Sequence, residues 1–166
     1  ICETSVHRAV QVNETGERIA VHPSVAFFCA DNTNGYGDST GNFSGTRDQN
    51  SAFVDRFSYT FKFNYLPPAD EANLISKRTG LNVNAATIIV KFANTAREKS
   101  KAGMLTQPPS LRQLFSWAEA VRDGVPIKNS FESSVVMKYP EDCHAELWAI
   151  FTATVNVAQF KKFLGK

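Results

Sequence analysis

The sequence predicts an α/β segment followed by an all-helical domain. Up to residue 65, apolar residues alternate with polar ones or form short runs bounded by glycine and proline, as in strands and loops. From residue 66 on, apolar residues recur every three to four positions, which is typical of amphipathic helices. Hydrophobic residues make up 43% of the 166 residues and charged ones 20%, the composition of a globular protein. Because the two patterns occupy separate parts of the chain, they predict two lobes, 1–66 and 67–166.

The first lobe is predicted to hold a hairpin and two further strands. Residues 10–12 and 18–21 alternate around a glycine-containing turn, which predicts a β-hairpin. The continuous apolar run of residues 25–30 predicts a strand that is buried on both faces. A long polar loop and a short helix at 49–54 follow, and the alternation in residues 58–63 predicts the last strand of this lobe.

The second lobe is predicted to be a series of helices. Pro67 and Pro68 with two acids in the next turn mark the start of the first helix, and Gly80 marks its end. The helices are expected at 67–79, 83–100, 111–121, 127–138 and 141–155. The aromatic residues of this lobe have helical spacing and apolar neighbours, so we expect them to form its core and not a platform for stacking bases.

Charge and cysteine content exclude several classes of protein. The net charge of +2 argues against a dedicated nucleic-acid surface. No apolar run approaches the roughly 20 residues that span a bilayer, so no membrane contact is expected. The three scattered cysteines are expected to be buried free thiols in a reducing compartment, which favours the cytoplasm. Cys143 and His144 lack a second pair at ligand spacing, so no metal site is predicted.

The glycine-rich loop of residues 31–48 is too long and irregular for a direct phosphate loop. Its glycines fit neither GxGxxG nor GxxxxGK[ST], and no lysine-serine or lysine-threonine pair follows them. One alternative is a mobile surface loop; the other is a loop with a function, as many long loops have.

A resemblance to a known family favours the functional alternative. The segments that carry it are DNTNGYGDSTG (31–41), GT (45–46), DRF (55–57), NYLP (64–67), PSLR (109–112) and WAE (117–119). Their order along the chain resembles that in the AAA+ subunit of cobaltochelatase and, more broadly, in the MoxR-like and dynein-related AAA+ ATPases.

The resemblance implies the C-terminal part of an AAA+ αβα core, with the sensor-1 strand and the last core strand, followed by an all-helical lid. Such ATPases bind ATP through a Walker A loop and Mg²⁺ through a Walker B acid. Neither motif occurs in the printed sequence. In the family's order both precede residue 1, so we expect the ATP phosphate cradle and the Mg²⁺ ligands upstream and no activity from this chain alone.

The resemblance also implies roles for three residues. Asn32 corresponds to sensor 1, which positions the attacking water, with Asn34 as the second choice; the alternative is an asparagine that stabilises a turn. Arg56 corresponds to the arginine finger that reaches a neighbouring subunit's nucleotide, with Arg47 as its competitor. The alternative for Arg56 is a helix-end arginine that pairs with Asp55 or with a backbone carbonyl. Arg112 corresponds to sensor 2, a lid residue that contacts the bound nucleotide.

Two functions follow as expectations. The first is the sensor and lid portion of an AAA+ ATPase that assembles into a ring, expected to be a hexamer, and remodels a partner carrying a von Willebrand A domain. The sequence shows no tetrapyrrole site and no metal-delivery site. The second is a non-catalytic interaction module that keeps the AAA+ fold.

Overall fold

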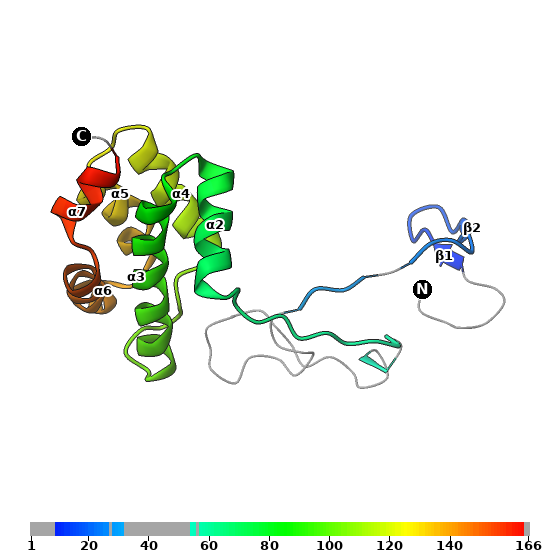
Figure 1. Ribbon diagram of the computed structural model, residues 1–166. Coiled ribbons are helices and arrows are strands. Elements are labelled where there is room, and N and C mark those ends of the chain that lie inside the picture. The colour runs from blue at the N-terminus through cyan, green and yellow to red at the C-terminus, as the bar shows by residue number, and fades with distance from the viewer. Residues whose placement is uncertain (1–8, 27, 32–53, 56, 165–166) are drawn as a thin grey trace. The chain divides into compact units, whose positions relative to one another are not determined.

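The computed structural model describes residues 9–26, 28–31, 54–55 and 57–164. The chain divides into two units, Ile1–Phe63 and Asn64–Lys166. The described part is mostly helical, with a small two-stranded sheet in the first unit (Figure 1).

The hairpin predicted at the start of the chain is confirmed. Strands β1 (Ala9–Gln11) and β2 (Arg18–Ala20) pair antiparallel, with Val10 opposite Ile19. Gly16 closes the turn at a φ of 72°, and its amide donates to the Val12 carbonyl at 2.8 Å. A positive φ is readily adopted by glycine, which explains its place in this turn.

The strands predicted at 25–30 and 58–63 are wrong for the residues that the structure describes there. None of these residues is in a strand, and Phe28 and Phe63 are 95% and 91% exposed. Cys29, expected to be buried, is exposed as well, whereas Cys143 is buried. The physical reason is that a strand needs a hydrogen-bonded neighbour, and the sheet in the described part contains β1 and β2 alone. The predicted helix at 49–54 lies outside the described residues except for Val54.

The second unit is helical, as the sequence predicts. Its elements are α2 (Pro68–Thr79), α3 (Val83–Lys101), α4 (Leu111–Arg122), α5 (Ile127–Ser134), the 3₁₀ turn η1 (Val136–Lys138), α6 (Glu141–Thr154) and α7 (Val157–Phe163). Two details differ from the prediction. The helix expected over 127–138 ends at Ser134 and is followed by the separate turn η1, and α7 was not expected.

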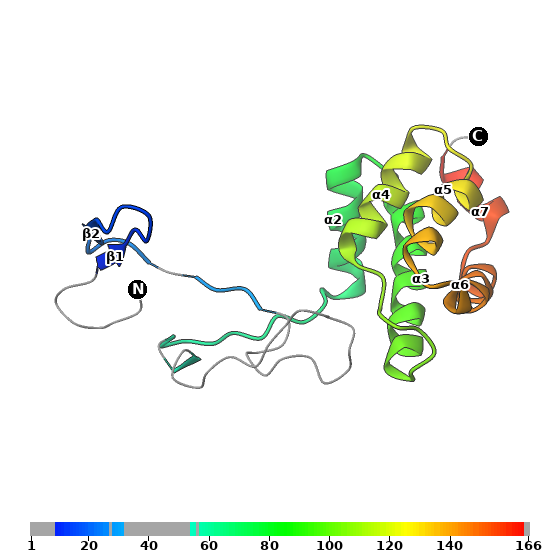
Figure 2. The same ribbon diagram turned by 180° about the vertical axis from the view of Figure 1, so that it is seen from behind.

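Helix α3 is the centre of this unit. Figures 1 and 2 show it between α2 on one side and α6 on the other, with α4 and α5 covering a third side. Helices α2 and α4 run side by side in the same direction, so both begin at the same end of the unit.

Aromatic side chains fill the space between α3, α4, α5 and α6. Phe92 meets Trp117 edge-on at 5.4 Å between ring centroids, and Phe131 lies 4.6 Å from Phe151. Phe92, Trp117 and Phe131 have no exposed surface, and Trp148 packs against the same cluster. The aromatic core expected from the helical spacing is therefore present, and Phe92, Trp117 and Phe131 are covered by protein.

Candidate functional site

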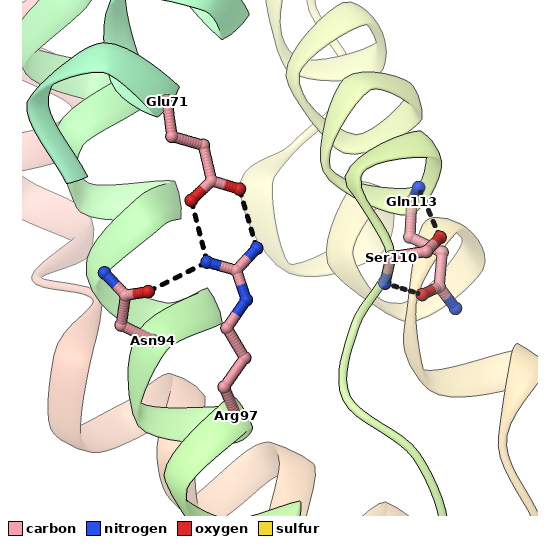
Figure 3. Close-up of polar contacts among 5 residues, drawn as sticks. All are labelled: Glu71, Asn94, Arg97, Ser110 and Gln113. Carbon is pink, nitrogen blue, oxygen red and sulfur yellow. Dashed lines mark hydrogen bonds and ion pairs between the residues drawn. The ribbon is translucent and has the colours of Figure 1, made fainter. Parts of the chain in front are cut away.

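The first turn of α4 holds Arg112 and is fixed by a reciprocal cap. The hydroxyl of Ser110 accepts from the Gln113 amide at 3.3 Å, and the Gln113 side-chain oxygen accepts from the Ser110 amide at 2.7 Å (Figure 3). This capping box satisfies amides that a helix otherwise leaves without partners. It therefore sets the position from which Arg112 projects.

Arg112 itself is exposed, and the structure shows no hydrogen bond or ion pair between it and another described residue. A positive side chain in the first turn of a helix lies at the positive end of the helix dipole, which is mildly unfavourable. An anion bound beside it would remove that disadvantage. The placement therefore suits a side chain that contacts the phosphates of a nucleotide.

Two other arginines, at the ends of α2 and α4, have structural contacts. The guanidinium of Arg78 lies over the ring of Phe115, 4.4 Å from its centroid. Arg122 donates to the Thr79 carbonyl at 2.5 Å and also binds the carboxylate of Asp123, whose pKa that contact lowers. Arg122 is exposed, and it satisfies a carbonyl at the end of α2, where a cation is favourable.

A buried charged network lies between α2 and α3, and sequence reasoning missed it. Arg97 makes two hydrogen bonds with Glu71, at 2.6 and 2.7 Å, and a third with the side-chain oxygen of Asn94 at 2.8 Å (Figure 3). The side chains of Arg97 and Glu71 are 4% and 3% exposed. A signal was available: Arg97 continues the three- and four-residue spacing of Ala86, Val90 and Ala93 on the buried face of α3.

Tyr65 lies against this network, and the buried Tyr139 follows η1. The Arg97 guanidinium lies over the Tyr65 ring, 3.8 Å from its centroid. Burial raises the pKa of Tyr139, and the neighbouring Cys143 and Tyr65 contribute smaller effects in the same direction. The Tyr139 hydroxyl and the Nε of Arg97 are buried without a hydrogen-bond partner among the described residues.

A groove of about 470 Å³ runs between the first turn of α2 and the outer side of α3. Its walls are mainly apolar, and among the described residues that line it Lys91 carries the one charge. The described ranges contain no group of three or more histidine, cysteine or acidic side chains that could hold a metal. Among the same residues, none of the helices has the length and apolar character needed to span a bilayer.

Four of the residues singled out from the sequence lie outside the described residues: Asn32, Asn34, Arg47 and Arg56. Their roles stay predictions. Of the candidate site residues, the structure therefore places Arg112.

Comparison with known proteins agrees with the resemblance. Residues 71–147, from α2 to α6, match the CbbQ/NirQ/NorQ C-terminal domain family. Over 106 residues the chain is 32% identical to the aerobic cobaltochelatase subunit CobS of Sinorhizobium sp. That match covers 61% of this chain and 32% of the relative, so the chain spans about a third of that protein's length. The resemblance to the cobaltochelatase AAA+ subunit group is thereby confirmed.

Proposed function

We propose that this chain is the sensor and lid portion of a ring-forming AAA+ ATPase, in which ATP hydrolysis drives the remodelling of a partner protein. The observation that carries the proposal is the placement of Arg112. It projects from the capped first turn of α4, exposed and without a protein partner in the described part, inside the segment that matches the CbbQ/NirQ/NorQ C-terminal domain. A guanidinium there suits charge-assisted contacts to phosphate oxygens.

The remaining parts of the proposal rest on the resemblance. Asn32 serves as sensor 1 and Arg56 as the arginine finger of a neighbouring subunit, while ATP and Mg²⁺ are held mainly by residues outside this chain. The assembly is a cytoplasmic ring, a hexamer in the simplest case, and its partner carries a von Willebrand A domain.

The test is nucleotide binding by the complete protein with Arg112 replaced. Arg112→Ala removes one charge-assisted contact, so we expect ATP affinity to fall by about ten- to a hundredfold. Arg112→Lys keeps the charge but loses the planar fork, and we expect an intermediate value. Lys128→Ala is the matched control, because it removes one exposed positive charge from α5 and leaves α4 untouched.

Fluorescent ATP titration measures the ATP affinity of the wild type and of the three variants, and circular dichroism checks the fold of each variant. Equal ATP affinity in Arg112→Ala and Lys128→Ala would show that Arg112 does not contact the nucleotide. A complete protein that binds no ATP at all would favour the non-catalytic interaction module.

A further inference from the structure

The segment that leads into the helical unit, residues 64–67, is held against it by Tyr65. The ring of Tyr65 is stacked on the guanidinium of Arg97 at 3.8 Å. Tyr65 is 55% exposed whereas Arg97 is 4% exposed, so the tyrosine ring covers a charge that would otherwise face water. Contacts of this kind are stronger when the cation is desolvated.

The surface on which Tyr65 rests is rigid. Glu71 of α2 and Asn94 of α3 together accept three hydrogen bonds from the Arg97 guanidinium, which fixes the plane of that group (Figure 3). A guanidinium is itself planar and pre-organised, so little further order is required when a ring stacks on it. Tyr65 is thus anchored to α2 and α3 at once.

The chain between Tyr65 and α2 has little freedom to bend. Pro67 and Pro68 both have a fixed φ, and Pro68 is already the first residue of α2. The stiff backbone and the stacking contact of Tyr65 with Arg97 therefore lie next to each other in the chain.

We propose that Tyr65 is a positioning residue: by stacking on the Arg97 held by Glu71 and Asn94, it fixes the direction in which the chain enters the helical unit. A displacement of residues 64–67 then moves α2 and α3 as one body and is not absorbed by bending of the segment. The mechanical part of this inference rests on the proposed function, in which nucleotide binding moves the lid.

The anchoring is tested without reference to ATP. Hydrogen exchange of the complete protein is compared for wild type, Tyr65→Leu, Tyr65→Phe and Ile150→Val, the last a buried control in α6 far from Tyr65 in sequence. Loss of a cation–π contact is expected to speed exchange of the Glu71 and Ala72 amides about tenfold in Tyr65→Leu. Tyr65→Phe keeps the ring and is expected to match wild type, as is Ile150→Val at these two amides. Equal exchange in Tyr65→Leu and Tyr65→Phe would overturn the proposal.

The transmission is tested by spin labels at Thr15→Cys in the hairpin and Lys91→Cys in α3, both exposed positions, in a Cys2→Ser and Cys29→Ser background. We expect ATP to shift the distance between the labels in wild type and in Tyr65→Phe, and Tyr65→Leu to lose at least half of that shift. A full shift in Tyr65→Leu would overturn the transmission role even with faster exchange. No shift in wild type would overturn the ATP-driven function instead, while the exchange result still decides the anchoring.

Discussion

Arg97 and Glu71, 26 residues apart in sequence, form a buried bidentate ion pair between α3 and α2, with nitrogen–oxygen distances of 2.6 and 2.7 Å. Burial makes the pair sensitive to the loss of either partner. Removing one charge leaves the other without compensation in the interior, which costs much more than the intact pair contributes.

Glu71→Ala is therefore expected to lower the free energy of unfolding by about 3–5 kcal/mol. The double variant Glu71→Leu with Arg97→Met replaces the pair by apolar groups of similar size and is expected to lose much less. Urea unfolding followed by circular dichroism measures both. A single variant within about 1 kcal/mol of wild type would show that Arg97 readily finds water when Glu71 is gone.

Gly80, which ends α2, gives a second prediction. It has a φ of 75° and its amide donates to the Ser76 carbonyl at 2.8 Å. A side chain at this φ is strained, so Gly80→Ala is expected to cost about 1–2 kcal/mol of unfolding free energy.

Gly103→Ala is the matched control for Gly80→Ala. Gly103 has nearly the same φ, 77°, but open space around its missing Cβ, whereas a Cβ at Gly80 would lie 3.5 Å from the Cδ of Arg122. That distance is an ordinary contact, so we expect equal losses in thermal unfolding. A larger loss at Gly80 would mean that Arg122 is displaced from the Thr79 carbonyl, and no loss at either site would contradict the strain.

Tyr139 predicts a dependence of stability on alkaline pH. Burial raises its pKa in the folded protein above the ordinary value of 10.0. Above about pH 10 the Tyr139 phenol keeps its proton in the folded chain but loses it in the unfolded chain. The contribution of Tyr139 to the free energy of unfolding is therefore fully present below about pH 10 and falls as the pH rises further. At pH 7 we expect Tyr139→Phe to unfold at the same urea concentration as the wild type, because the Tyr139 hydroxyl has no hydrogen-bond partner among the described residues.

The measurement for Tyr139 is urea unfolding of wild type and Tyr139→Phe between pH 8 and 11. The variant is expected to lose less stability over the alkaline part of this range. Parallel curves for the two proteins would show that Tyr139 titrates alike in the folded and unfolded chains.

The helices could be predicted from the sequence because their determinants are local. Pro68 and Gly80 mark ends that the structure confirms, and the apolar period identifies the buried faces. Helix α7 was missed because its seven residues are too short for a periodic signal, although Asn156 caps it through the Gln159 amide. The predictions of strands at 25–30 and 58–63 were wrong for a different reason: an apolar run forms a strand only beside another strand.

The candidate site could be predicted only where a motif is local. Arg112 was found from the motif around it, and the structure places it at an exposed helix start. The Glu71–Arg97 pair and the stacking of Tyr65 on Arg97 join residues far apart in sequence, and no local pattern reports which charges meet. The position of Arg97 on an apolar helix face shows that it is buried, but not what it binds.

Arg56 gives the prediction that tests the ring. A finger supplied by the next subunit contacts charge that grows in the transition state, so it should affect turnover more than binding. Arg56→Ala in the complete protein is expected to leave ATP affinity within a few-fold and to lower turnover by about a thousandfold or more. Equilibrium titration and steady-state hydrolysis measure the two effects, and Arg47→Ala is the parallel variant.

Mixing experiments show whether Arg56 acts across a subunit interface. The Arg56→Ala subunit keeps its own nucleotide pocket, so a partner subunit with an inactivated Walker B acid but an intact Arg56 should complement it. Hydrolysis is then expected to pass through a maximum as the mixing ratio changes, because mixed rings contain interfaces where an intact finger meets an intact pocket. Sizing chromatography with two differently tagged subunits verifies that mixed rings form. If mixed rings form and no ratio restores hydrolysis, Arg56 does not act in trans, and the same mixing series with Arg47→Ala decides whether Arg47 is the finger.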